Sequence, residues 1–322
     1  MTDHLGYRIV GPCTGERRLV NWLAAFAGYA SLDDRIDFDR ESYLSAFTFG
    51  PDFRLHLDAT HSTAGFEGAC GGEFVWFDID RTDLELARRD AARLALRLVE
   101  RFALADDCLL MFFSGSKGFH IGLPTLIWGP PPSLVFNRVA RRFADELAAA
   151  VNVGIDAGTY AKVQAFRAPN SLHPKTGLHK RALGLDELIG LSVGRIQGLA
   201  GTPEPFDLPE PKAGNAQAAA DWQSALQAVE AEGAAAAERK ATGGSVRLNR
   251  MTLDFIREGA TPGDRHRALF SAAANLAEFG CPSELAHQLL TESALDSGLS
   301  PNETRRQIDC GLSHNAKGHS AV

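Results

Sequence analysis

The stretch Phe74-Val75-Trp76-Phe77-Asp78-Ile79-Asp80 is an apolar, aromatic segment that ends in two acids. Its length, its aromatic content and the flanking Gly71-Gly72 favour a β-strand over a helix. Because side chains alternate along a strand, Asp78 and Asp80 leave by the same face. Adjacent carboxylates repel each other, and a divalent cation such as Mg²⁺ or Mn²⁺ would remove that cost. One helix-capping acid and one solvated acid would explain the same pattern without a metal.

Length and composition limit the class of protein. The chain has 322 residues and a formal net charge of -7, which suits one large domain with a small one, or two domains. A negative total charge argues against a protein that coats nucleic acid with its whole surface, but it leaves room for a local basic channel. No apolar run is long enough to cross a bilayer, and residues 1–4 lack a signal-peptide pattern. We therefore expect a cytoplasmic protein that does not enter membranes.

The five cysteines are scattered along the chain, with no C-x-x-C pair and an odd total. This pattern is typical of a reducing compartment and argues against both a disulfide framework and a structural zinc site. A zinc knuckle built from Cys70, His56 and His61 is the less favoured alternative. No structural zinc is therefore expected.

A second apolar strand, expected over Cys108–Phe113, runs into the turn Ser114-Gly115-Ser116-Lys117 and then into the segment 118–123. Glycines in such a turn allow a ligand to approach the backbone, and successive N–H groups form a nest for an anion. Lys117 adds a cation, and His120 adds a directional donor. A tight hairpin whose histidine is only a satisfied core side chain would explain the same residues.

Two helices are expected around these strands. Apolar residues recur at helical spacing in Asp83–Phe102, and Leu134–Val151 is a second amphipathic helix. The apolar segment 153–155 then leads to a single acid, Asp156. The order strand, helix, strand, strand, helix, strand predicts a split β-α-β layer with an antiparallel sheet, and hence an α+β fold. In such a layer the acids of the first strand, His120 and Asp156 would converge in one cleft.

The segment 157–185 contains no acid and is rich in cations. These cations are Lys162, Arg167, Lys175, Lys180 and Arg181. Prolines and a glycine forbid a regular helix across 167–180. A solvated basic face and a loop that faces phosphate groups are both open interpretations.

The remaining chain divides into flanking elements and a second domain. Before the acidic strand we expect a helix over Glu16–Tyr29 and a strand over Phe53–Leu57. Pro203–Pro211 indicates a domain exit, and Ala216–Ala241 a spacer helix with little apolar face. The helices expected after it are Asn249–Glu258, Asp264–Phe279, Ser283–Glu292 and Pro301–His314. The expected divisions are residues 1–208, a linker over 209–244, and a small all-α domain over 245–322.

The order of these motifs resembles the archaeo-eukaryotic primase superfamily, in particular its primase-polymerase (PrimPol-like) branch. That family has an apolar strand ending D-x-D or D-x-E, a turn with S-x-H or S-G-x-x-G-x-H, and a later acid after an apolar pair. The matching segments here are Asp78-Ile79-Asp80, Ser114–His120 and Ile155-Asp156. Phe166-Arg167 and Pro169–Lys180 are similar to further stretches of the family, the latter written R-x-P-x-S-x-H-x-K-T-G. The resemblance covers residues 70–185, while 245–316 is more loosely similar to helical domains of phage and plasmid primases.

The resemblance implies an RRM-like antiparallel catalytic core and the activity of a DNA primase or DNA-directed polymerase, which is a nucleotidyltransferase. It implies that Asp78, Asp80 and Asp156 hold two metal ions, Mg²⁺ or Mn²⁺, for nucleotide transfer onto a 3′-hydroxyl. The groups expected around the triphosphate are Ser114, Gly115, Ser116, Lys117, His120, Arg167 and Lys175, with His173 ranked below His120. Those expected to contact the backbone of a DNA template or primer are Lys162, Lys180 and Arg181.

The match also has departures. Gly118 stands where the short form of the second motif has serine, and only the longer form accommodates it. We find no counterpart of the zinc-binding insertion of cellular primase small subunits, and no helicase P-loop. The implied partners are single-stranded DNA and NTP or dNTP, in replication, repair or mobile-element replication. A helicase, if one acts with this protein, would be a separate chain.

Two other classes of protein fit parts of the sequence. The segment 74–82 also fits the apolar D-x-D-x-T motif of haloacid-dehalogenase-like phosphatases, with Asp78 as nucleophile and Asp80 as acid. Such a phosphatase needs a later strand with paired acids, whereas Asp156 stands alone. A catalytically silent DNA-binding or replication-initiation module on the same fold is the second alternative. Such a module has no use for three carboxylates that face nucleic acid.

Overall fold

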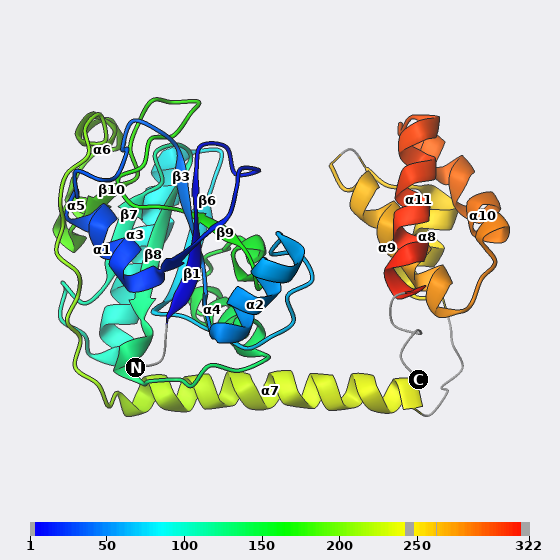
Figure 1. Cartoon of the computed structure of the whole chain (residues 1–322), viewed down its shortest axis with the longest axis horizontal. Coiled ribbons are helices and arrows are strands. Elements are labelled where there is room, and N and C mark those ends of the chain that lie inside the picture. The colour runs from blue at the N-terminus through cyan, green and yellow to red at the C-terminus, as the bar shows by residue number, and fades with distance from the viewer. Residues whose placement is uncertain (1–3, 242–247, 262, 317–322) are drawn as a thin grey trace. The chain divides into compact units, whose positions relative to one another are not determined.

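Two antiparallel sheets form the N-terminal part of the chain (Figure 1). The computed structural model describes residues 4–241, 248–261 and 263–316, which fall into two compact units divided after Gly233. The strands of the first sheet are β1 (Leu5–Val10), β2 (Arg18–Asn21), β3 (Ser42–Ser45), β4 (Thr48–Phe49), β5 (Cys70–Gly71) and β9 (Ala165–Arg167). Their order is β5-β4-β1-β3-β9, and β2 pairs with β1.

The second sheet contains the acidic strand. Its strands are β6 (Phe74–Asp80), β7 (Leu110–Phe113), β8 (Gly118–Pro124) and β10 (Arg181–Leu183), in the order β10-β7-β8-β6. Helix α3 (Leu84–Phe102) joins β6 to β7, which lie on either side of β8, and α4 (Phe136–Ala149) follows β8. All three strand pairs are antiparallel. The predicted α+β class, with a split β-α-β connection in an antiparallel sheet, is confirmed. The expected last strand is wrong, because the segment 153–155 is not a strand and β10 takes the fourth place in the sheet.

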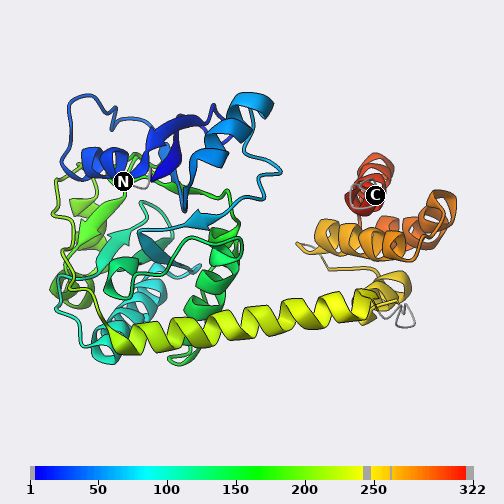
Figure 2. The same ribbon diagram turned by 60° about the horizontal axis from the view of Figure 1, so that its bottom comes forward.

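The alternating side chains of β6 pack on two different layers. Trp76 points to the first sheet, because its ring lies 5.2 Å from Phe166 of β9 and 6.2 Å from Phe26. On the other side of the second sheet, α3 contacts β6 and β8, and α4 contacts β6. Figure 2 shows the N-terminal strands, in blue, and α3, in cyan, on opposite sides of this sheet. Asp78 and Asp80 share the orientation of Trp76 and therefore face the gap between the two sheets.

Helix α3 forms where its sequence predicts it. The side chain of Asp83 accepts hydrogen bonds from the backbone N–H groups of Glu85 and Leu86, which caps the first turn. The helix ends at Ala103, which has a left-handed backbone conformation with φ of 48°. The buried side chains fall on one face: Ala87, Ala91, Leu94, Ala95, Leu98 and Phe102. The opposite face, with its arginines, is left to solvent.

Two predictions for the N-terminal segment are wrong. The expected strand over Phe53–Leu57 lies inside helix α2 (Pro51–Thr60), which starts with proline at its first position and buries Phe53. The expected helix over Glu16–Tyr29 consists of β2 followed by α1 (Trp22–Ala30). Its first residues pair with β1 because that pairing continues the sheet. Short segments complete the first unit: η1 (Thr125–Ile127), η2 (Ala157–Tyr160), α5 (Leu185–Gly190) and α6 (Val193–Leu199).

Helix α7 (Ala216–Ala241) has the predicted bounds but is more than a spacer. The Trp222 ring packs against the rings of Phe136, Phe143 and Trp128 at 5.0 to 5.6 Å. Other buried residues of its first half are Ala218, Ala225 and Val229. This half therefore belongs to the core of the first unit, and the prediction of little apolar face is wrong for it.

The second unit contains a helical core. Its helices are α8 (Arg250–Glu258), α9 (Arg265–Glu278), α10 (Ser283–Asp296) and α11 (Pro301–Ala316). Each of their ends lies within four residues of the predicted one. Helices α9 and α11 cross closely, because a Cβ on Gly311 would lie 2.6 Å from the Cβ of Ala273. The core residues include Phe255, Leu269, Leu276, Leu290 and Ile308. In the described part of the chain, no helix is both long and apolar enough to span a membrane.

Candidate functional site

A pocket of about 220 Å³ opens between the two sheets, where β6, the β7–β8 turn and β9 meet. The residues that line it are Asp78, Asp80, Ser114, Ser116, Lys117, His120, Asp156, Thr159, Gln164, Ala165, Phe166, Arg167 and His173. Most of these side chains are polar or charged. The pocket therefore suits a polar, charged ligand better than an apolar one.

Three carboxylates that are far apart in the sequence reach this pocket. Asp78 and Asp80 lie on one face of β6. The segment after α4 brings in Asp156, whose backbone N–H donates a hydrogen bond to the carbonyl oxygen of Asp78 at 2.9 Å. The Asp156 side chain also caps η2 by accepting from the N–H of Gly158 at 2.8 Å. The predicted convergence of these acids in one cleft is therefore present, while their chemical roles stay predictions.

Asp78 has the most unusual electrostatic environment of the three acids. Its side chain is 16% exposed, and its Oδ1 atom has no hydrogen-bond partner. Burial raises the pKa of this carboxyl from 3.8 to about 7, and the negative charges of Asp80 and Asp156 add to the increase. A positively charged ligand would offset the free-energy cost of ionising the buried Asp78 carboxyl group, because it stabilises the ionised form.

The β7–β8 turn is shaped by glycine. Gly118 faces Asp80 across the β6–β8 pair, and a Cβ there would lie 2.1 Å from Asp80 Oδ1 and 2.5 Å from the carbonyl of Ile79. Gly115 has a φ of +85°, which favours glycine. The Ser114 hydroxyl accepts hydrogen bonds from the N–H groups of Ser116 and Gly118 at 3.4 and 3.2 Å. These two N–H groups are thus satisfied within the turn, which leaves a smaller anion nest than the sequence predicts.

Lys117 pairs with an acid of the pocket. Its Nζ lies 2.8 Å from Asp80 Oδ2, and this contact raises the pKa of the lysine. Most of the Lys117 side chain is exposed, so the ammonium group can change partners without disturbing the core. In this structure the lysine balances the charge of one of the clustered carboxylates.

His120 is buried against both layers. Its ring centroid lies 4.5 Å from that of Phe166, and its Nε2 atom is 3.4 Å from Asp78 Oδ1. Burial lowers the pKa of His120 well below its ordinary value, and the charges of Lys180 and Arg167 lower it further. The ring is therefore neutral at pH 7, and its Nδ1 atom has no hydrogen-bond partner.

Arg167 and His173 form the opposite wall of the pocket. The guanidinium of Arg167 donates to the carbonyl of Leu172 at 3.3 Å and to the Tyr43 hydroxyl at 3.4 Å, and lies over the Tyr43 ring. Burial, and then the charges of Arg167 and Lys175, lower the pKa of His173. Two residues predicted near a triphosphate, Gly115 and Lys175, are not among those that line the pocket. Lys175 is exposed on its loop.

The prediction that Lys180 contacts nucleic acid needs correction. This side chain is 1% exposed, and its Nζ donates to the carbonyl of Arg167 at 2.8 Å. The ammonium position lies 4.3 Å from the Phe166 ring, 4.7 Å from Phe112 and 5.2 Å from Trp76. Burial lowers the pKa of Lys180 well below its ordinary value, although the Asp78 charge opposes this shift. Lys180 thus supports the floor of the pocket from inside the protein.

The other two residues predicted to touch DNA also have internal partners. The Lys162 ammonium donates to the carbonyl oxygens of Glu67, Gly68 and Leu134 at 2.8 to 3.1 Å. These three bonds use all the donors of an ammonium group. Arg181 is buried and pairs with Glu204. Neither cation is available to a DNA backbone in this structure.

Sequence reasoning missed several residues of the pocket. Thr159, Gln164, Ala165 and Phe166 line it, and none of them was assigned a role from the sequence. Phe166 links the two layers, because its ring contacts His120 on the second sheet. It lies in the stretch Phe166-Arg167 that resembles the family, but only the tertiary structure shows this contact.

The donor chemistry of the pocket suits a hard divalent cation. Asp78 Oδ1 is buried without a partner, and oxygen ligands are those that Mg²⁺ and Mn²⁺ prefer. The carboxylates of Asp80 and Asp156 are engaged by Lys117 and by the N–H of Gly158. Within the described residues, no group of three or more His, Cys, Asp or Glu side chains is arranged to hold a metal ion. The carboxylates would therefore change partners to bind one.

Comparisons with known proteins add little. No family model matches the chain, and no curated protein matches it. A solved structure, described as the crystal structure of primase RepB′, is similar to it with 13% sequence identity and a TM-score of 0.36. The match covers 97% of this chain and 88% of that chain. A TM-score this low supports no conclusion about function, so the function has to be inferred from the pocket.

Proposed function

We propose that this chain is a nucleotidyltransferase of the DNA primase or primase-polymerase type, with an RRM-like catalytic core. It would add NTP or dNTP to a 3′-hydroxyl on a single-stranded DNA template. The observation that carries the proposal is the meeting of three carboxylates with two histidines, an arginine and a lysine in one pocket. Clustered, partly buried acids cost free energy, and a cation together with a triphosphate would offset that cost.

The basic side of the pocket is suited to a triphosphate. Arg167 offers a planar set of donors, and it is held in place by Tyr43 and Leu172. Lys117 is 69% exposed, so its ammonium group could turn from Asp80 to a phosphate oxygen. His173 lines the same wall and would add a further donor. Together these groups would orient the phosphates and stabilise the charge that develops on the leaving group.

The buried imidazole has a separate role in this proposal. His120 is neutral, because burial lowers its pKa, and its Nδ1 atom lacks a partner within the protein. A ligand that fills the pocket would satisfy this atom. His120 would therefore position the nucleotide by a hydrogen bond rather than by charge.

The acids of the pocket would hold divalent cations. Asp78, Asp80 and Asp156 supply the oxygen donors, and Asp78 Oδ1 is the atom most in need of a partner. Bound cations would lower the barrier to attack by the 3′-hydroxyl and neutralise the triphosphate. Lys117 would then turn away from Asp80, because the positive charge of a bound cation repels the ammonium group.

A primer-extension assay tests this function. The full-length protein is incubated with a labelled primer on a single-stranded template, with NTP or dNTP and with Mg²⁺ or Mn²⁺. We expect Asp78→Asn and Asp80→Asn to lower the extension rate by about a thousandfold or more, since both remove an oxygen charge at the reacting centre. The exposed Asp107 lies in a turn outside the pocket, so Asp107→Asn is the matched control. Normal extension by the double variant of Asp78 and Asp80 would show that the assignment is wrong.

Two further measurements separate the remaining alternatives. Release of phosphate from a chromogenic monoester, without primer extension, would favour a phosphatase. Binding of single-stranded DNA without metal-dependent incorporation of a nucleotide would favour a silent DNA-binding module. Omitting the primer distinguishes initiation of new chains from extension alone.

A further inference from the structure

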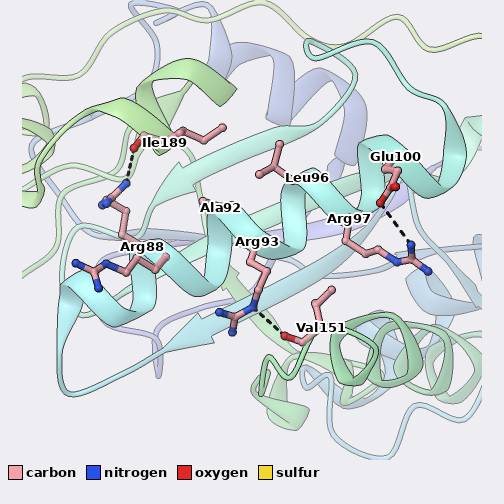
Figure 3. Close-up of a pocket in the computed structure, with 9 residues that line it drawn as sticks. Arg88, Ala92, Arg93, Leu96, Arg97, Glu100, Val151 and Ile189 are labelled. Atoms are coloured by element: carbon pink, nitrogen blue, oxygen red, sulfur yellow. Dashed lines mark hydrogen bonds and ion pairs between the residues drawn. The ribbon is translucent and has the colours of Figure 1, made fainter.

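The outer face of α3 carries a second pocket, which shares no residue with the first. Its volume is about 630 Å³, and it lies where α3 passes the end of α5 and the segment that follows α4 (Figure 3). Four arginines of α3 line it: Arg88, Arg89, Arg93 and Arg97. These guanidinium groups alternate along α3 with the acids Glu85, Asp90 and Glu100, which pair with them.

The floor of this pocket is apolar. Ala92 and Leu96 of α3, Val151 and Ile189 form it. Leu96 is 46% exposed and Ile189 is 43% exposed, although both are large apolar side chains. Figure 3 shows Ile189 beside Arg88, and Leu96 on the side of α3 away from Arg93. An apolar floor with a charged rim is the composition of a recognition site for a partner, because neither water nor a simple anion satisfies both parts.

Two of the arginines form hydrogen bonds that connect α3 to neighbouring segments. Arg88 donates to the carbonyl oxygens of Leu188 and Ile189 at 2.7 and 2.8 Å, which ties α3 to α5. Arg93 donates to the carbonyl of Val151 at 2.8 Å and pairs with Asp90 at 2.6 Å. These contacts fix the shape of the pocket.

The other two arginines are loosely held. Arg89 is 66% exposed, and its contact with Glu85 is 3.3 Å long, while Glu85 also pairs with Arg88. Arg97 reaches only the exposed Glu100, at 3.5 Å. Exposed pairs of this kind contribute little to stability, so these guanidinium groups can turn to a ligand at small cost. They are eight residues apart on α3, or about 12 Å along the helix axis, and Leu96 directly precedes Arg97.

We propose that this arginine pocket binds an acidic peptide segment of a partner protein, in which carboxylates flank an apolar side chain. The carboxylates would pair with Arg89 and Arg97, and the apolar side chain would cover Leu96 and Ile189. Arginine suits carboxylate pairing because its planar donors bind both oxygens. Charge complementarity thus supplies the selectivity, and burial of the floor supplies the affinity.

A nucleic-acid backbone fits the arginine pocket less well. A phosphate chain would meet the guanidinium groups but would leave Leu96 and Ile189 exposed to water. The acids Glu85, Asp90 and Glu100 are also close to the arginines, which weakens attraction for a polyanion. A peptide would also bury an apolar side chain against Leu96 and Ile189, and this burial compensates for the weaker electrostatic attraction.

Binding of an array of labelled peptides to the full-length protein tests the proposal. The peptides vary the apolar residue at the centre and the number of aspartates that flank it. The best binder is then measured by fluorescence anisotropy against Arg89→Glu/Arg97→Glu, Leu96→Ser and the control Arg54→Glu. Arg54 is an exposed arginine of α2 outside the arginine pocket. A labelled single-stranded oligonucleotide is titrated in parallel.

We expect the double charge reversal to weaken peptide binding by about a hundredfold, or roughly tenfold for each cation. Leu96→Ser should weaken it by roughly tenfold, and Arg54→Glu should leave it unchanged. Added salt should weaken the wild-type complex. Circular dichroism confirms that each variant is folded. The proposal is overturned if no acidic peptide binds, if binding survives the double reversal, or if only the oligonucleotide depends on Arg89 and Arg97.

Discussion

The pocket between the two sheets and the arginine pocket on α3 differ in whether their polar and charged groups have partners within the protein. Between the sheets, Asp78 Oδ1 and His120 Nδ1 are buried without hydrogen-bond partners, and three carboxylates share one small space. On α3, each of the four arginines has a carboxylate or carbonyl partner. Most buried polar atoms in folded proteins have hydrogen-bond partners, because a buried polar atom without one costs free energy. Retaining such atoms between the sheets indicates that a ligand completes that site.

The largest expected effect on stability is at the first pocket. Asp78→Asn should raise the free energy of unfolding by about 4 kcal/mol at pH 8, measured with denaturant in the presence of a chelator. The raised pKa of about 7 means that the folded protein binds more protons than the unfolded chain between pH 4 and pH 7. The wild type therefore loses stability as the pH rises through this window, while the variant does not. Equal pH dependence of the two proteins would show that Asp78 is not destabilising.

A second change tests how tightly the turn fits the acids. Gly118→Ala should lower the free energy of unfolding by about 2 kcal/mol, because its Cβ would clash with Asp80 and with the backbone of Ile79. Gly194 lies in α6, with no atom near its would-be Cβ, so Gly194→Ala is the matched control and should be neutral or stabilising. Thermal or denaturant unfolding measures both. If both variants lose the same free energy of unfolding, close packing of the turn against Asp80 does not explain the glycine at position 118.

A third change concerns an arginine of α3 that is fully paired. Arg101 binds Asp221 of α7 through two hydrogen bonds of 2.6 and 2.7 Å, in a half-buried position. Arg101→Met should lower the free energy of unfolding by about 1 kcal/mol. Arg141→Met removes an exposed pair with Asp145 and should change it by less than about 0.5 kcal/mol. A smaller loss for Arg101 than for Arg141 would contradict the role given to this pairing.

The smallest effect is expected at the rim of the arginine pocket. Arg89→Ala should change the free energy of unfolding by less than about 0.5 kcal/mol, because its contact with Glu85 is long and exposed. Arg93→Ala should cost more, since it loses the bonds to Val151 and Asp90. Unfolding curves of both variants compare them directly. A larger loss for Arg89 would mean that it holds the fold rather than a ligand.

The sequence predicts the local elements of this protein well. Helices α3 and α4 follow from apolar residues at helical spacing, α7 from its content of Ala, Gln and Glu, and α8–α11 from the glycines and prolines that separate them. The acidic strand follows from the alternation of β6. These features depend on neighbours in the chain, so they can be read from it. The short segment 53–57 cannot, because Pro51 and the burial of Phe53 make it helical in α2.

The site was harder to predict than the helices. The cations of 157–185 look alike in the sequence, yet only Arg167 lines the pocket, while Lys162 and Lys180 bind carbonyl groups inside the protein. Burial of Lys180 depends on Trp76, Phe112 and Phe166, which come from three separate strands. No local pattern encodes such a cage. The convergence of Asp156 with β6 was expected from a strand over 153–155 and from the family resemblance. The structure reaches it without that strand, through a backbone hydrogen bond from Asp156 to Asp78.

Direct measurement of Mn²⁺ binding by electron paramagnetic resonance is the sharpest test of the carboxylate site. The full-length protein is titrated with Mn²⁺ alone and compared with Asp80→Asn, Asp156→Asn and the control Asp107→Asn. We expect the wild type and Asp107→Asn to bind the ion alike, and the two pocket variants to lose at least about tenfold in affinity. Undiminished Mn²⁺ binding by both pocket variants would contradict a cation site shared by Asp78, Asp80 and Asp156.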